Sequence, residues 1–134
     1  MKNVLLLPIF LFISIHIGSA QFIPNFYIGN VVSITTNYNS AWITNNKQDK
    51  TIKHSILITA EGGDISAIFV LYFGENTYEA EANSPIPNVY NVKSWHHISE
   101  YDRIYQMLSS DSQLGIGFLN RIEEFPNRIK ISRY

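Results

Sequence analysis

The segment from Ile65 to Phe73 constrains the fold more than any other part of the chain. Its sequence, ISAIFVLYF, is apolar at nearly every position. Alternate residues of a strand point to opposite faces of its sheet, so Phe69 and Leu71 share one face. Val70 and Tyr72 share the other. Because a strand that is apolar on both faces has to be covered on both sides, the sequence predicts a central strand in a fold of at least two layers.

A β-hairpin is expected around this strand. Residues Thr51 to Ala60 precede it and alternate in polarity. Between the two segments, Glu61–Asp64 contains two glycines, which adopt the positive φ of tight hairpin turns. Further strands are expected at Tyr27–Thr36, Ala41–Thr44, Thr77–Ala82, Val89–Trp95, Leu114–Leu119 and Arg128–Ser132, with a loop over Asn83–Pro87 because of its two prolines.

One helix is expected, over about residues 99–109. Ser99 is its expected N-cap, with Asp102 as a variant of the capping box. Apolar residues then recur at i, i+3, i+4 and i+7, which predicts one apolar face that covers part of the second face of the central strand, the face of Val70 and Tyr72. This stripe consists of Tyr101, Ile104, Tyr105 and Leu108.

Together these elements predict a mainly β (α+β) fold of about eight strands and one helix, in a mainly antiparallel arrangement. Two architectures remain open, because an antiparallel sheet with the helix on one face and a β-sandwich both account for the doubly apolar strand. No internal repeat or low-complexity linker divides the chain. Residues 21–134 are therefore expected to form a single β-rich domain.

The first twenty residues have the pattern of a secretory signal peptide. Lys2 precedes an apolar run from Val4 to Ile17, and small residues end at Ala20. The run is shorter than the roughly 20 residues that a helix needs to span a bilayer. We expect export through the Sec route, cleavage between Ala20 and Gln21, a secreted or periplasmic product, and no membrane anchor.

Cysteine and charge exclude several classes of function. The 134 residues contain no cysteine, so neither a disulfide nor a thiol nucleophile is available. Ten basic and eleven acidic side chains give a formal net charge of −1, whereas nucleic-acid binders usually carry a basic balance. The charges are unevenly spread: Glu61–Glu81 contains acidic but no basic residues, and the C-terminal part is basic. The C-terminal bases are either a solvated face or an edge that docks on an acidic partner or an anionic surface. They are Arg121, Arg128, Lys130 and Arg133, against Glu123 and Glu124.

The densest polar cluster lies where the last strand before the helix ends. His96, His97 and Glu100, together with Asp102 or the distant His54, could form a metal site of two imidazoles and a carboxylate. However, adjacent residues of a strand face opposite sides, and no H-E-x-x-H spacing is present. Strand-edge histidines beside a helix start are the simpler interpretation, so we expect no metal ion and no cofactor.

The sequence assigns no catalytic residue. No G-x-S-x-G nucleophile elbow is present in the sequence. Glu79 and Glu81 share a strand face, but an exposed face offers neither the desolvation nor the groove that a glycosidase pair needs. Leu114–Phe118 contains G-x-G without the helix start of a phosphate loop. Its glycines instead predict a close approach by another backbone or by the helix.

Aromatic residues provide the best indication of binding. Tyr38 and Trp42 lie in an asparagine-rich segment. An indole beside amides and hydroxyls suits a sugar ring, and the same residues suit a protein interface, where Trp and Tyr serve as anchors. Trp42 and Trp95 are equally compatible with the core of a small sandwich.

The sequence thus favours an exported, non-enzymatic binding or interaction protein of the cell envelope or extracellular space. It would recognise another protein through an exposed strand edge or the Trp42 loop. A carbohydrate-binding module with a glycan ligand is the first alternative, and a small metal-dependent hydrolase built on His96, His97 and Glu100 is the second. We expect no nucleic-acid partner. The candidate binding residues are Tyr38, Trp42, Trp95, His96 and His97.

Overall fold

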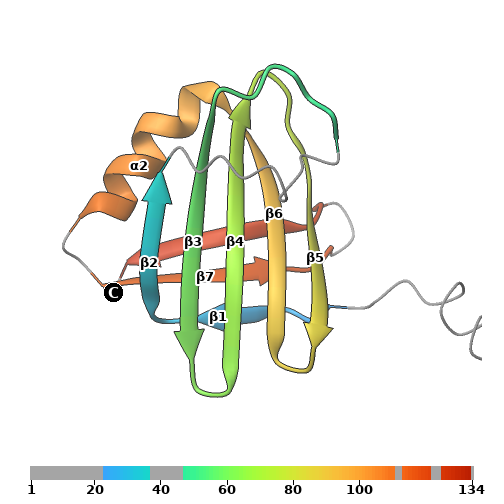
Figure 1. Ribbon diagram of the computed structural model, residues 1–134, viewed down its shortest axis with the longest axis vertical. Helices are drawn as coiled ribbons and strands as arrows, with labels where there is room; N and C mark the ends of the chain where they lie inside the picture. The colour runs from blue at the N-terminus through green and yellow to red at the C-terminus, as the bar shows by residue number, and fades with distance from the viewer. Residues whose placement is uncertain (1–22, 37–46, 111–112, 122–124, 134) are drawn as a thin grey trace, which may run out of the picture.

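The computed structural model describes residues 23–36, 47–110, 113–121 and 125–133 (Figure 1). Eight strands, one short 3₁₀ helix and one α-helix lie in these ranges. In chain order they are β1 (Phe26–Ile28), β2 (Val31–Thr36), β3 (His54–Gly62), β4 (Ile65–Gly74), β5 (Tyr78–Ile86), β6 (Val89–His97), η1 (Ile98–Glu100), α2 (Tyr101–Ser109), β7 (Leu114–Leu119) and β8 (Arg128–Arg133).

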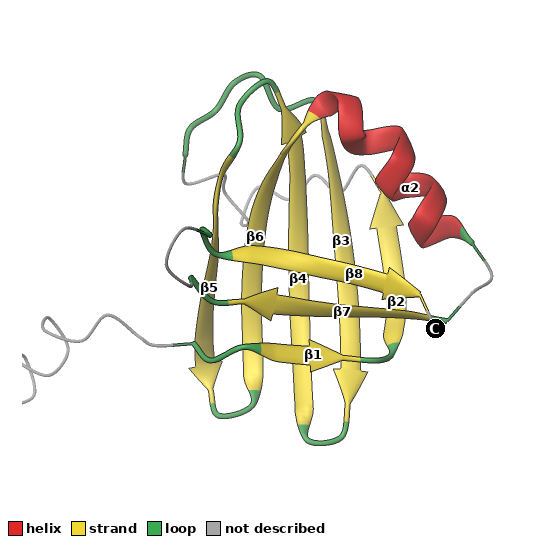
Figure 2. Ribbon diagram, turned by 180° about the vertical axis from the view of Figure 1, so that it is seen from behind, coloured by secondary structure: helices red, strands yellow, loops and turns green. Residues whose placement is uncertain are grey.

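The strands form two sheets, which confirms the mainly β class with one helix. The larger sheet has the order β2-β3-β4-β6-β5, and the smaller has the order β1-β7-β8. The smaller sheet and α2 lie on the same face of the larger sheet (Figure 2). The strands of the smaller sheet run across those of the larger one. The fold therefore combines the two expected architectures: a sandwich, with the helix filling one corner.

Strand β4 is central and apolar on both faces, as predicted. Its inner face contributes Phe69 and Phe73 to the core between the sheets, and both side chains are fully buried. Ile104 and Leu108 of α2 join the same core, so the helix covers this face of β4 and not the opposite face, where the sequence placed it. The outer face of β4 carries a separate buried cluster, formed by Val70, Tyr72 and Trp95.

The predicted hairpin is present, and it pairs β3 with β4 over its whole length. Gly63 lies in its turn and has the expected positive φ, 58°. The glycines of β7 also behave as predicted, since the smaller sheet is closely packed there. A Cβ atom on Gly117 would meet the backbone oxygen of Phe26 in β1.

The expected loop over Asn83–Pro87 is wrong, because β5 continues to Ile86. Strand β5 is the edge of the larger sheet, and its pairing with β6 is irregular between Asn83 and Ile86. A proline at such a place removes no ladder hydrogen bond. Asn88, with φ 66°, turns the chain back into β6. The chain passes β6's place in the sheet, forms β5 at the edge, and then returns to form β6 between β4 and β5. The β4–β6 pair is therefore parallel, and the sheet is mixed rather than purely antiparallel.

The expected strand Tyr27–Thr36 is two strands in the structure. The chain breaks at Gly29 and Asn30, so that β1 belongs to the smaller sheet and β2 to the larger one. Such corners occur where a strand passes from one packed sheet to the other. The Asn30 carbonyl accepts a hydrogen bond from the Glu61 amide, at 3.1 Å.

The helix is present where the stripe predicted it, but its capping differs. The 3₁₀ turn η1 begins at Ile98, one residue before the expected cap Ser99. His97 Nδ1 accepts the Ser99 amide at 3.2 Å, so His97 is the cap. Within the stripe, Ile104 is buried and Tyr105 is 41% exposed.

Candidate functional site

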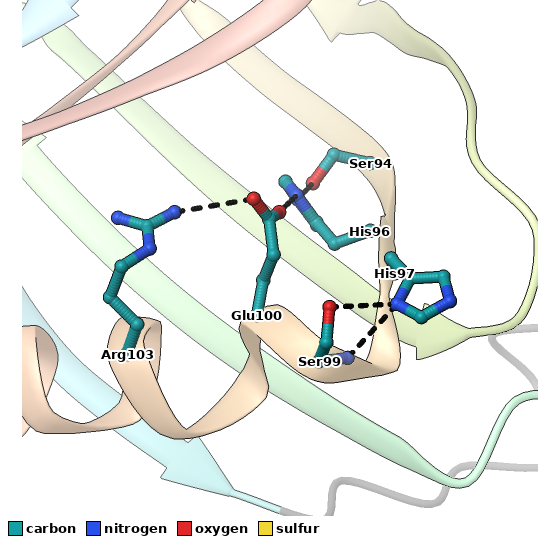
Figure 3. Close-up of polar contacts among 6 residues, drawn as sticks. All are labelled: Ser94, His96, His97, Ser99, Glu100 and Arg103. Atoms are coloured by element: carbon teal, nitrogen blue, oxygen red, sulfur yellow. Dashed lines mark hydrogen bonds and ion pairs between the residues drawn. The ribbon is translucent and has the colours of Figure 1, made fainter.

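Strand alternation places Ser94 and His96 together on the inner face of β6. The Ser94 hydroxyl lies 2.7 Å from Nε2 of His96 (Figure 3). The imidazole stacks on Phe73 of β4, with 5.4 Å between the ring centroids. His96 is therefore held on two sides at the end of the core.

Two charged residues from the helical segment lie beside this imidazole. Glu100 Oε2 is 3.7 Å from His96 Nδ1, and Arg103 Nη2 is 3.6 Å from the other oxygen of Glu100. Burial lowers the pKa of His96 below its ordinary 6.5, and the Glu100 carboxylate offsets part of this effect. His96 is consequently neutral at pH 7.

Hollows open on both sides of His96. One, of about 330 Å³, lies between β5, β6 and the start of β8, and includes Ser94 and Asn127 in its wall. The other, of about 280 Å³, lies between α2 and the middle of β8. Both are lined by His96 and Ile129. The two hollows therefore lie next to each other along β8, and we call them together the β8 groove.

The wall of the β8 groove is an unpaired strand edge. Among the strands that the structure describes, β8 ends the order of the smaller sheet and pairs with β7 alone. Within the described residues, no backbone hydrogen bond joins Arg128–Arg133 to any other segment. Just before β8, the Asn127 carbonyl accepts the Ala80 amide of β5 at 3.0 Å, which closes that end of the groove. One side of β8 thus presents its backbone N–H and C=O groups to the groove.

Basic side chains dominate the rim of the β8 groove. Arg128 and Lys130 extend from β8, and Arg103 from α2. Neither Arg128 nor Lys130 has an ion pair among the residues that the structure describes. The acidic side chains here are Glu100, beside Arg103, and Glu79, which accepts the Asn127 amide at 2.8 Å.

The structure separates the two adjacent histidines. His97 is exposed and caps η1, whereas His96 lies inside on the opposite face of β6. The third candidate histidine, His54, stacks on Tyr101, with 4.3 Å between the ring centroids. No group of three histidine, aspartate or glutamate side chains suited to a metal ion occurs among the described residues.

Trp95 belongs to the outer cluster of the larger sheet. Its side chain is buried, Tyr72 stacks on it, and the Lys47 ammonium lies 5.4 Å from the centre of the ring. Lys47 also forms an ion pair with Glu81 at 2.6 Å. Trp95 also lies in the wall of the 330 Å³ hollow, so its part in binding stays a prediction. Tyr38 and Trp42 lie outside the described residues, so their part in binding stays a prediction.

Sequence reasoning singled out His96 and Glu100, which the structure brings together, but not the other residues grouped around the imidazole. The pattern Ser-x-His on a strand was a usable signal for Ser94, because alternate residues share a face. Arg103 and Ile129 carry no such signal, since only the tertiary fold brings α2 and β8 to the same groove.

Comparison with protein-family models, with curated proteins and with solved structures found no match for this chain. In the described part of the chain, no helix has both the length and the apolar character needed to cross a membrane.

Proposed function

We propose that this chain is an exported binding protein that recognises another protein by pairing an extended, acidic segment of it with β8. The observation that carries the proposal is the unpaired edge of β8 along a groove. An extended peptide that adds a strand to such an edge gains main-chain hydrogen bonds, and pockets for alternate side chains provide specificity.

The two hollows of the β8 groove suit this mode of binding. They lie on the two sides of Ile129, which lines both, so side chains from successive inward positions of a bound strand reach different hollows. The floor includes the half-buried side chains of Ile129 and Ile131, which pack on the core. A bound segment would gain affinity both from apolar contact with this floor and from backbone pairing with β8.

Charge favours an acidic partner segment. Arg128, Lys130 and Arg133 are the charged residues of β8, in a chain whose overall net charge is −1. Complementary charge speeds encounter and disfavours partners of the wrong sign. Of the two possible partners of the basic C-terminal edge, we therefore favour a protein segment rich in Asp or Glu over an anionic surface.

Export is the part of the proposal that rests on the sequence alone. The pattern of Met1 to Ala20 supports it. The mass of the intact protein, recovered from the medium or the periplasm after expression of the full chain, tests it. A mass that begins at Gln21 is expected, and an uncleaved chain retained in the cytoplasm would contradict export.

The binding proposal is tested with labelled peptides whose fluorescence anisotropy rises on binding. The probe is a six-residue peptide that alternates glutamate and valine, which matches the six residues of β8. N-methylation of one alternate set of its amides should abolish binding, because those amides face β8. Methylation of the other set should leave it. Equal effects of the two methylated peptides would contradict strand addition.

A matched pair of protein variants locates the site. Ile129→Gln alters the floor shared by both hollows and should weaken peptide binding at least tenfold, a loss of about 1.4 kcal/mol. Ile68→Gln makes the same change on the outer face of β4, where Ile68 is 41% exposed, and should leave the affinity unchanged. Thermal melting followed by circular dichroism confirms that both variants fold.

A further inference from the structure

We infer that the hollow between α2 and β8 is a carboxylate site, in which Arg103 and Lys130 hold an acidic side chain of the bound segment. This inference rests on the proposed function and identifies the side chain that the partner presents. The hollow of about 280 Å³ has these two bases on walls from different elements. Its remaining lining includes Ile104, Met107 and Ile129.

The cations of this hollow are neutralised only in part by the side chains that the structure describes. Arg103 is 62% exposed at its side chain, and its contact with Glu100 is a long one, 3.6 Å. Lys130 is exposed and has no ion pair within the described residues. A carboxylate that enters between them gains two charge-assisted contacts, while its methylene groups contact the apolar lining.

Arg103 and Lys130 also differ in what they can supply. The planar guanidinium of Arg103 can donate two parallel hydrogen bonds to a carboxylate, whereas the Lys130 ammonium acts as a compact point charge. Arg103 already has one oxygen of Glu100 within 3.6 Å, so the partner carboxylate competes with Glu100 for the same donor group. Lys130 is therefore the cleaner probe of attraction to the ligand.

His96 couples this hollow to pH. The charged groups around its ring are Glu100 and Arg103 from the helical segment, Lys130 from β8 and Glu79 across the other hollow. A bound carboxylate adds negative charge near the imidazole, which favours the protonated ring and raises its pKa. By linkage, lower pH then strengthens binding of a carboxylate segment, as long as the peptide carboxylate itself stays ionised.

The test compares two peptides that differ only in charge. The glutamate–valine peptide and its glutamine–valine counterpart have the same shape, and both offer the same backbone to β8. The glutamate peptide should bind at least tenfold more tightly at low salt. Lowering the pH from 7.5 to 5.5 should strengthen the glutamate peptide alone, because a glutamate side chain of ordinary pKa 4.3 remains ionised over this range.

Variants assign the preference to the hollow. Lys130→Gln and Arg103→Gln should each reduce the preference for glutamate severalfold, and His96→Gln should remove its pH dependence. Arg133→Gln removes a positive charge from the same strand outside the hollow and should change the preference little. If Arg103→Gln fails to fold, the exposed Lys130→Gln carries the test by itself.

The outcomes separate this inference from the proposed function. If both peptides bind equally and remain sensitive to alternate N-methylation, the carboxylate site is refuted while strand addition stands. If neither peptide binds, the proposed function fails. If the wild type, Lys130→Gln and Arg103→Gln all prefer the glutamate peptide to the same degree, other residues bind the carboxylate and the inference is overturned.

Discussion

The hydroxyl of Ser94 lies 2.7 Å from Nε2 of His96, two residues along the same strand. Because Ser94 is almost fully buried, this contact supplies a polar partner to the imidazole where water has little access. The ring is therefore fixed between Ser94 and the face of Phe73. Burial in this position lowers the pKa of the ring, so its protonation responds to the groups that surround it.

Stability should fall as the pH drops below about 6.5, in part because of His96. Its pKa is lowered in the folded state, so the unfolded chain binds this proton first. Over the window between the folded pKa and 6.5, the loss approaches about 1.4 kcal/mol per pH unit. Urea unfolding at pH 7.5 and 5.5 measures it. His96→Gln should flatten the slope, whereas His97→Gln, on the exposed side of β6, should retain it.

Only the buried residues of the apolar stripe should stabilise the packing of α2. Ile104 is 5% exposed and packs in the main core, so Ile104→Ala should lower the free energy of unfolding by roughly 2–4 kcal/mol. Tyr105→Ala, at a position that is 41% exposed, should cost far less. Chemical denaturation compares them, and equal losses would show that α2 packs through a different face.

The two glycines of β7 should respond differently to alanine. At Gly117 a Cβ atom meets the Phe26 backbone, which cannot rotate away, so Gly117→Ala should destabilise by roughly 1–3 kcal/mol. At Gly115 the obstacle is the Tyr27 ring, whose hydroxyl contacts Ser132. Shortening that side chain, as in Tyr27→Ala, should therefore rescue Gly115→Ala but not Gly117→Ala, as measured by the denaturation midpoint.

The Asp49 carboxylate should tether the segment before β3. It accepts the Thr51 amide at 2.9 Å and the Thr51 hydroxyl at 2.6 Å, and these bonds lower the pKa of Asp49 below 3.8. The Thr51 hydroxyl oxygen in turn accepts the Glu75 amide at 2.9 Å. Asp49→Asn should therefore speed hydrogen exchange at Thr51 and Glu75.

The sign of the accompanying pH effect follows from the lowered pKa of Asp49. Its stabilising contribution is present above pH 3.8 and is lost as the pH falls through the folded pKa. The difference in stability between the wild type and Asp49→Asn should accordingly shrink in acid. A difference that is independent of pH would mean that the charge of Asp49 plays no part.

Local patterns were enough to predict the centre of the fold. The doubly apolar β4, the glycine turn to β3 and the helical stripe of α2 each express a short-range rule, and all three are present. Segments whose structure depends on their neighbours were predicted less well. Pro85 lies in a strand because β5 is an edge, and the break between β1 and β2 depends on the second sheet.

The site was predictable only in part, for the same reason. His96 stood out because histidines are few, but its neighbour in sequence, His97, lies on the other side of the strand. The residues that share its groove, Arg103 and Ile129, are brought there by contacts between distant parts of the chain. The excess of bases in the C-terminal part of the sequence indicated a basic edge, without showing what lies opposite.

The unpaired edge of β8 also bears on how copies of this protein behave toward one another. An open strand edge is a template for pairing with the same edge of a second molecule, which is a route to aggregation. Arg128, Lys130 and Arg133 place like charges on both edges that would meet. The positive charges that we propose attract an acidic segment should thus also oppose self-assembly, and added salt, which screens them, should weaken both effects together.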